Sequence, residues 1–238
     1  MIVLKTRQIE RVALALSIAV ATIVFTMWPG LDVKVAGLFF DGNGFAGDRW
    51  LWSRAIYRSM PWLGWLLGAW AAVSLFAPRL LGPRGLRARR RRGAMLLLAG
   101  VVGVGLVVHV ALKDHWGRPR PGSIEAFGGP MPFQQALAPS SYCPRNCSFV
   151  SGHAAGGFVL LAIGVFGARR KRLRWLAIGM AAGFVVGAAR MAQGGHFLSD
   201  IVFCALIMWA TAVLLRECWL RAAVVARSRH RRAQSVAP

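Results

Sequence analysis

Apolar residues occur in six long runs along the chain, at about 12–28, 60–77, 94–112, 153–168, 174–189 and 197–215. Each run approaches the roughly 17–25 helical residues needed to cross a hydrocarbon core. Because backbone polar groups cannot stay unpaired in lipid, each run is expected to form a helix. The run at 153–168 is rich in Gly and Ala and is the least regular of the six. The pattern predicts an all-α polytopic membrane protein, with six transmembrane helices in a single domain over residues 1–238.

Composition agrees with this pattern, since 56% of the residues are hydrophobic and the mean hydropathy is +0.51. The formal net charge of +22 would also suit a nucleic-acid-binding protein if the basic residues formed one face of a soluble domain. Twenty-one of the 30 Lys and Arg residues instead fall on one side of the six-helix arrangement. They lie before the first run, in the connections 78–93 and 168–174, and after the sixth run.

The positive-inside rule places these basic segments in the cytoplasm, together with both chain termini and a basic tail at 217–238. Topology therefore accounts for the basicity, and the bilayer rather than a nucleic acid is the expected partner. The segments left on the outer side are 29–59, 113–152 and the turn at 190–196. The first contains "WPGLDVKVAGLFFDGNGF", which is typical of an interfacial amphipathic stretch lying along the outer headgroups.

Two cysteines, Cys143 and Cys147, lie in the second outer segment, in "YCPRNCSF". In an oxidising compartment they are expected to form a small-loop disulfide or to remain free thiols. No second cysteine pair nearby would complete a metal site.

His196 and Asp200 are four residues apart, which would stack them on one face of a helix. A carboxylate in that position can accept a hydrogen bond from one imidazole nitrogen and leave the other free as a nucleophile or base. The alternative is a helix-surface pair with no role. At a membrane boundary otherwise poor in acids, we favour the functional interpretation.

The stretch "SFVSGH" supplies Ser151, Gly152 and His153 where the fourth run begins. Ser is a good helix cap, and free N–H groups at a helix start attract anions. Gly152 allows close backbone approach to a ligand, and His153 could move a proton there. A plain turn before a membrane span would have the same sequence.

Three cations, Lys113, Arg120 and Arg190, lie on the outer side, where basic residues are scarce. Arg presents a planar fork suited to phosphate oxygens, and Lys a compact charge. Pro119 and Pro121 flank Arg120 and restrict its backbone. This distribution indicates an anion-binding site rather than membrane anchors.

The chemistry that suits this set is phosphoryl transfer without a metal or another cofactor, because no cluster has the spacing of a two-metal phosphatase. The cations would neutralise the phosphate oxygens. His196 would attack phosphorus, and His153 would protonate the leaving alcohol and then activate water.

Three motifs occur in order: K-x(6)-R-P at 113–121, S-G-H at 151–153 and R-x(5)-H-x(3)-D at 190–200. Together they resemble the signature of the type 2 phosphatidic acid phosphatase family. The resemblance implies His196 as nucleophile, Asp200 as the residue that orients it, and His153 as acid and base. It also implies a phosphate site composed of Lys113, Arg120, Ser151, Gly152 and Arg190. The chain departs from the family pattern at Val150, often Pro, and at Ala189, usually Ser.

Within that family, "KDHWGRPRP" and "CPRNCSFVSGHAA" are similar to the bacterial lipid A phosphatase branch. His115, Arg118 and Arg145 would then contact a second phosphate or a sugar headgroup, or else lie on the loop surface.

The resulting expectation is a phosphatase of the bacterial inner membrane that has a periplasmic active site and acts on a lipid A-type phosphate. Undecaprenyl diphosphate, phosphatidylglycerol phosphate and phosphatidic acid are alternative substrates, and phosphotransfer to a lipid hydroxyl is an alternative reaction. An anion transporter is the non-enzymatic alternative, but it would more naturally place its charges near the middle of the membrane. The sequence does not specify an oligomeric state.

Overall fold

The computed structural model describes residues 2–82 and 84–236 of the chain. Within those residues the regular structure is entirely helical, as predicted. The α-helices are α1 (Ile2–Met27), α2 (Gly30–Gly37), α3 (Leu51–Phe76), α4 (Leu86–Leu98), α5 (Gly152–Phe158), α6 (Arg169–Ala192) and α7 (Leu198–Val236). A π-helical segment, η3 (Ala99–Lys113), continues α4. Short 3₁₀ segments are η1 (Ala46–Asp48), η2 (Pro78–Leu81), η4 (Pro121–Ser123), η5 (Glu125–Phe127) and η6 (Val159–Gly164).

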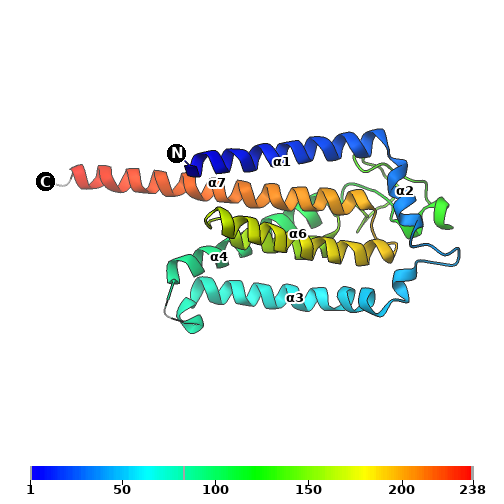
Figure 1. Ribbon diagram of the computed structural model, residues 1–238, viewed down its shortest axis with the longest axis horizontal. Coiled ribbons are helices and arrows are strands. Elements are labelled where there is room, and N and C mark those ends of the chain that lie inside the picture. The colour runs from blue at the N-terminus through cyan, green and yellow to red at the C-terminus, as the bar shows by residue number, and fades with distance from the viewer. Residues whose placement is uncertain (1, 83, 237–238) are drawn as a thin grey trace.

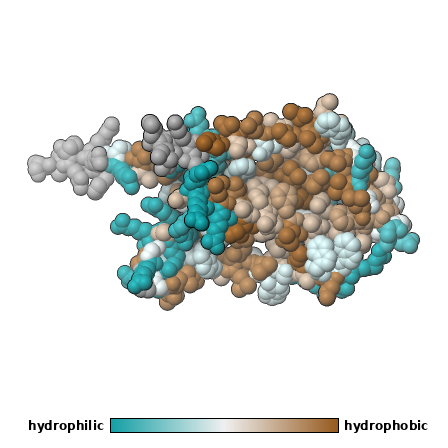
Figure 2. Space-filling model, viewed as in Figure 1, coloured by the Kyte–Doolittle hydropathy of each residue, from teal (hydrophilic) through white to brown (hydrophobic). Residues whose placement is uncertain are grey.

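The long helices lie roughly parallel, and both chain termini lie at the same end of the bundle (Figure 1). We call this the terminal end, and we call the opposite end, where α2 and the segment 114–151 lie, the loop end. Five helical stretches are long and apolar enough to cross a membrane: 7–27, 51–76, 86–113, 169–192 and 198–228. A broad hydrophobic band covers the flank of the bundle, with hydrophilic residues gathered toward its ends (Figure 2). The prediction of a polytopic membrane protein is confirmed.

The fourth crossing is shorter than the sequence pattern suggested. It consists of α5 followed by η6, which ends at Gly164 rather than near 168. With the rise of each helix type, this segment spans only about 22 Å. Most of its residues are buried, and a Cβ on Gly157 would lie 2.8 Å from the backbone of Gly183 on α6. The other helices cover it, so its backbone need not match the bilayer thickness.

A small apolar cluster at the loop end consists of Ala36, Phe45, Ile124 and Phe197. The rings of Phe45 and Phe127 pack edge to face, 5.3 Å apart. These contacts join α2, the turn after it, the segment 121–127 and the start of α7. The interfacial stretch expected in the first outer segment is therefore packed onto the residues around His196.

At the other end, α7 continues as one helix well past the predicted end of the sixth run. The predicted tail, 217–238, is thus an extension of α7 as far as Val236, and residues 237–238 lie outside the described part. Arg216 is buried there and pairs with Glu10 at 2.6 Å and Glu217 at 3.1 Å, which ties α7 to α1.

Candidate active site

Two parts of the long outer segment run side by side and bring the first motif next to the chain that leads into α5. The Cys147 N–H donates to the Lys113 carbonyl at 3.0 Å, and the Ser148 N–H donates to the Arg118 carbonyl at 2.8 Å. The Ser140 N–H donates to the Trp116 carbonyl at 2.9 Å. Residues that are some 30 positions apart in sequence thereby become neighbours.

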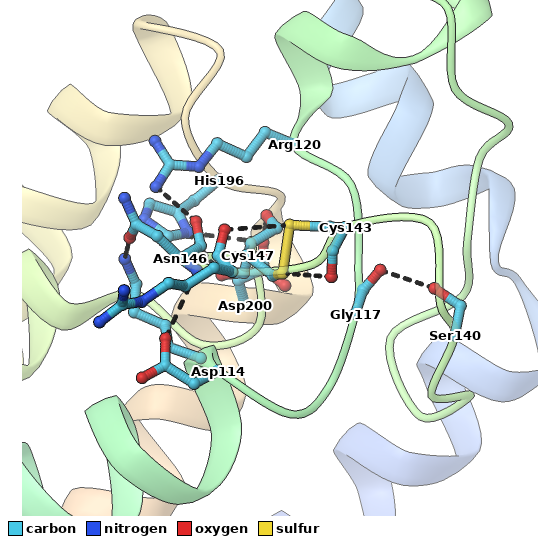
Figure 3. Close-up of a disulfide and its surroundings, with 12 residues drawn as sticks. Asp114, Gly117, Arg120, Ser140, Cys143, Asn146, Cys147, His196 and Asp200 are labelled. Carbon is cyan, nitrogen blue, oxygen red and sulfur yellow. Dashed lines mark hydrogen bonds and ion pairs between the residues drawn. A yellow bond between two sulfur atoms is a disulfide. The ribbon is translucent and has the colours of Figure 1, made fainter.

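Cys143 and Cys147 form a disulfide, and Asn146 lies in the loop that it closes (Figure 3). This loop brings Asn146 into contact with two of the predicted phosphate-binding residues. The Asn146 side-chain oxygen accepts a hydrogen bond from Lys113 Nζ at 2.5 Å, and its carbonyl accepts one from Arg120 Nη2 at 2.8 Å. Asn146 has a φ of 53°, a left-handed conformation that Asn tolerates better than most residues. Sequence reasoning missed Asn146, although its place between two cysteines was visible.

Arg190, on the last turn of α6, is directed toward the same region. Its guanidinium donates to the Gln193 side-chain oxygen and lies over the Tyr57 ring, 4.7 Å from the centroid. Its Nε is buried and has no acceptor among the residues that the structure describes. Lys113, Arg120 and Arg190 are close enough to repel one another electrostatically. Three gathered cations with an unsatisfied buried donor are suited to an anion.

His153 lies on the first turn of α5, where its ring stacks on Tyr57 with centroids 4.9 Å apart. Ser151 is the N-cap, and its hydroxyl accepts from the Ala154 N–H at 3.3 Å. A Cβ on Gly152 would lie 2.8 Å from the His109 ring, so this position accommodates only Gly without rearrangement. Tyr57 and His109 lie outside the three motifs, and the sequence offered no periodic signal that would have singled them out.

The His196 ring is held differently from the prediction. Its Nδ1 lies 2.7 Å from the Ser148 carbonyl but 3.7 Å from the nearer Asp200 oxygen, which is too long for a hydrogen bond. The reason is local: α7 begins at Leu198, so His196 precedes the helix and does not stack one turn below Asp200. With Nδ1–H donated to a carbonyl, Nε2 carries the free lone pair.

Asp200 stands at the third position of α7 and folds back to accept from the Phe197 N–H at 2.8 Å, as the acid of a capping box does. It also accepts from Ser148 Oγ and from Arg118 Nη1, each at 2.5 Å. Asp200 thus holds Ser148, and the Ser148 carbonyl holds the imidazole. Burial lowers the pKa of His196 to about 4, against the opposing effect of the Asp200 carboxylate, so the ring is neutral near pH 7.

The headgroup prediction for Arg118 is wrong, because this side chain is fully buried. Its guanidinium donates to Asp32 at 2.7 Å and to the Gln134 carbonyl at 2.9 Å, in addition to Asp200. It also lies over the Phe197 ring at 4.3 Å. His115 and Arg145 are exposed, and His115 Nδ1 lies 2.8 Å from the carbonyl of Val110 in the preceding segment η3. For these two residues the headgroup role stays a prediction.

Residues 93–223 match the family model described as PAP2 superfamily, and this range contains all three motifs. The chain belongs to this superfamily. No solved structure matches the chain.

The curated relatives of this PAP2-superfamily chain include two named "Lipid A 4'-phosphatase". The protein from Francisella tularensis subsp. novicida (strain U112) is 36% identical over 202 residues, which cover 79% of this chain and 86% of the relative. The protein from Rhizobium leguminosarum is 30% identical over 213 residues, which cover 82% of this chain and 91% of the relative. The similarity therefore extends well beyond the motifs of the superfamily.

Within the described residues, no group of three or more His, Cys, Asp or Glu side chains is arranged to hold a metal ion. In this PAP2-superfamily chain, the groups that gather at the site are cations and histidines, with the carboxylates of Asp200 and Asp32 behind them. Such a set can bind a phosphate and present a neutral imidazole to it.

Proposed function

We propose that this protein is a lipid phosphatase that removes a phosphate from a lipid A-type headgroup through a phosphohistidine at His196, without a metal. The observation that carries the proposal is the placement of a neutral, buried imidazole beside three cations, one of which has an unsatisfied donor. The names of the curated relatives support the substrate class. Membership of the PAP2 superfamily supports hydrolysis of a phosphomonoester.

In the first step, the lone pair of His196 Nε2 forms a bond to phosphorus. The bond between phosphorus and the lipid oxygen breaks, and the leaving oxygen takes its electron pair together with a proton from His153. The charge on the phosphoryl oxygens is neutralised by Lys113, Arg120 and Arg190. In this class of reaction, stabilising that charge in the transition state accounts for most of the catalysis.

In the second step, His153 accepts a proton from water, and the water oxygen attacks phosphorus. The bond between Nε2 and phosphorus breaks and returns its electron pair to the ring, which releases inorganic phosphate. The proton that His153 accepts here is the one that it delivers to the next leaving oxygen, so the cycle closes. The ring of Tyr57 supports both the proton carrier and Arg190 through the stacking contacts described above.

The orientation follows from the charge distribution. Both termini and the basic connections lie at the terminal end, and the site lies at the loop end. With basic segments retained in the cytoplasm, the site faces the periplasm of a bacterial inner membrane.

The deciding experiment measures phosphate release by the purified full-length chain in EDTA. The panel contains lipid A, undecaprenyl diphosphate, phosphatidylglycerol phosphate and phosphatidic acid. We expect fastest release from lipid A and none from His196→Gln, with folding checked by thermal unfolding. Activity that requires an added divalent metal, or that survives the substitution, would overturn the mechanism. Preference for another lipid would replace the substrate.

Hydrolysis and phosphotransfer are separated by following labelled phosphate in the presence of a second, hydroxyl-bearing lipid. Hydrolysis leaves the label in inorganic phosphate. Label recovered in the second lipid would identify a phosphotransferase that uses the same intermediate.

A further inference from the structure

Behind His196 lies a cluster of three buried charges drawn from distant parts of the chain. Asp32 comes from α2, Arg118 from the long outer segment and Asp200 from α7. The side chains of all three are 2% exposed or less. None of them is directed to solvent, and Asp32 and Arg118 belong to none of the roles in the reaction described above.

The hydrogen bonds define the charge state of Asp32. Arg118 Nη1 donates to Ser199 Oγ at 2.8 Å, so that hydroxyl directs its own proton to Asp32 Oδ2 at 2.5 Å. Oδ2 also accepts from Arg118 Nη2, and Oδ1 accepts from the Ser199 N–H at 2.9 Å. Every partner is a donor, which is the arrangement that favours an ionised carboxylate. Burial, and after it the neighbouring Asp200, raises the pKa of Asp32 above its ordinary value, and Arg118 and Ser199 oppose that rise.

Asp200 is surrounded in the same way, because Arg118, Ser148 and the Phe197 N–H all donate to it. Two carboxylates therefore share one guanidinium, and the cluster carries one excess negative charge. Burying such an excess is costly unless something nearby balances it. The nearest group able to acquire a positive charge is the His196 ring, 3.7 Å from Asp200.

We propose that Asp32 and Arg118 are positioning residues of the phosphoryl transfer. Together with Asp200 they form a buried cluster with one excess negative charge, which fixes Ser148 and stabilises the positive charge that the His196 ring acquires. The inference rests on the proposed phosphohistidine mechanism and extends it to α2, a helix outside the three motifs.

The charge balance of the step explains why one excess negative charge in the cluster favours the reaction. When the neutral ring forms its bond to phosphorus through Nε2, Nδ1 keeps its proton, so the ring gains a positive charge while the lipid oxygen leaves with its electron pair. The cluster and ring together then become neutral. In a region of low dielectric this balance lowers the energy of the intermediate more than it would in water.

Other charges also act on the ring, and they oppose the cluster. The titratable and charged groups around His196 are Lys113 at the end of η3, Arg120 in the long outer segment, Arg190 on α6, His153 on α5 and Asp200 on α7. The cations belong to the proposed phosphate site, whereas the Asp200 carboxylate lies 3.7 Å from Nδ1. The excess negative charge of the cluster offsets these cations, which otherwise disfavour a positive ring.

A merely structural role for the two residues can be distinguished by the direction of charge effects. Asp32→Asn keeps the shape and removes the excess negative charge, whereas Arg118→Gln increases it. We expect the pKa of the His196 ring to fall in Asp32→Asn and to rise in Arg118→Gln, each by about one unit, equivalent to a tenfold change in equilibrium. If the two residues only supported the fold, both substitutions would shift the pKa of His196 in the same direction, upward toward the pKa of a solvated histidine.

The measurement is an NMR titration of isotope-labelled histidine in the substrate-free, full-length protein, with the His196 signal assigned by its absence in His196→Gln. It needs no activity, so it remains informative even if the chain releases no phosphate from any lipid, an outcome that would defeat the proposed function alone. If Asp32→Asn does not fold, Arg118→Gln is compared with Arg118→Lys, which keeps the positive charge. A rise in the His196 pKa confined to Arg118→Gln supports the charge effect, and an equal rise in both variants overturns the inference. Shifts in the same direction, or no shift in Arg118→Gln, would overturn the inference.

Ser199→Ala is the matched control, because it removes two hydrogen bonds of the cluster and leaves all three charges. We expect the pKa of His196 to be unchanged in this variant. A shift as large as that of Asp32→Asn would show that contacts rather than charge are responsible.

Steady-state kinetics provide a second test of the role of Asp32. Because Asp32 contacts no substrate, Asp32→Asn is expected to lower kcat about tenfold, the equivalent of one pKa unit, with little change in KM. A rise in KM at constant kcat would contradict a role through His196.

Discussion

The imidazole Nδ1 of His196 lies 2.7 Å from the backbone carbonyl of Ser148, whereas the Asp200 carboxylate is 3.7 Å away. Ser148 therefore holds the predicted nucleophile through its backbone and, through its hydroxyl, holds the acid. This serine precedes the S-G-H motif by three positions and belongs to none of the recognised motifs. A backbone acceptor of this kind is invisible in a sequence, since any residue can supply it.

Ser148→Ala is expected to lower kcat about 10- to 100-fold, because a buried carboxylate oxygen loses a partner, at about 1–3 kcal/mol. Ser140→Ala is a suitable control, since among the described residues its hydroxyl donates to the Gly117 carbonyl alone, in the same outer segment. Steady-state kinetics of both variants provide the check. Equal losses in the two would indicate general loosening of the segment rather than a specific effect on Asp200.

The lowered pKa of His196 has a consequence for acid stability. The folded chain keeps this ring neutral down to about pH 4, whereas the unfolded chain protonates it near the ordinary value of 6.5. Between these values the unfolded state binds more protons, so stability falls as pH falls, by about 2 kcal/mol at pH 5 for this group. Thermal unfolding in detergent at pH 7 and pH 5 should show a smaller loss for His196→Gln than for the unmodified chain. Identical losses would refute the assignment.

As the pH is lowered, activity should begin to fall at a lower pH than stability does. The reaction needs a neutral His196, and that form remains dominant above about pH 4. The limb of kcat/KM that belongs to His196 is thus expected near pH 4 in the free enzyme. Fitting the pH profile of the unmodified chain would test this, and a His196 limb near pH 6.5 would contradict the buried site.

Tyr57 contacts both His153 and Arg190 through its ring rather than its hydroxyl. Tyr57→Phe should therefore retain most of the activity, whereas Tyr57→Ala should lose about tenfold or more, as stacking and cation–π contacts worth about 1–2 kcal/mol disappear. The pair of variants is compared in kcat/KM for the same lipid. Equal losses in both would show that the hydroxyl is the important group.

The Cys143–Cys147 disulfide closes the loop that places Asn146 against Lys113 and Arg120. Replacing both cysteines by Ser should lower kcat/KM about tenfold, because the cations lose a fixed neighbour and must be ordered when substrate binds. Cys218→Ser, an exposed thiol on α7, is the control and should have no effect. Reductant should impair the unmodified chain but not the double variant; impairment of both would implicate something other than this disulfide.

The orientation is tested by thiol labelling in a Cys218→Ser background, where the remaining thiol, Cys204, is buried. A membrane-impermeant reagent applied from the periplasm should label Asn43→Cys at the loop end and leave Arg87→Cys at the terminal end untouched. The reverse pattern would invert the topology derived from the positive-inside rule.

The residues alone predicted much of this protein. Six apolar runs predicted an all-helical membrane protein, and the confirmed helices follow from the need to pair every backbone group in lipid. The ordered motifs around Lys113, Ser151 and His196 predicted the family through their resemblance to its signature, and the family model confirms it. The short fourth crossing was misjudged in length, since Gly157 and Gly164 serve close packing against α6 rather than the bilayer.

Only the tertiary structure decided which distant positions are in contact. Arg118 and Asp32 are 86 residues apart, and nothing local indicates that the arginine is buried rather than exposed. Tyr57 reaches His153 across the bundle, and Ser148 replaces Asp200 as the partner of His196 because α7 begins two residues later than the i,i+4 spacing required. Sequence patterns report which residues share a face of one element. The partners that determine burial and charge come from packing between elements, which depends on the whole chain at once.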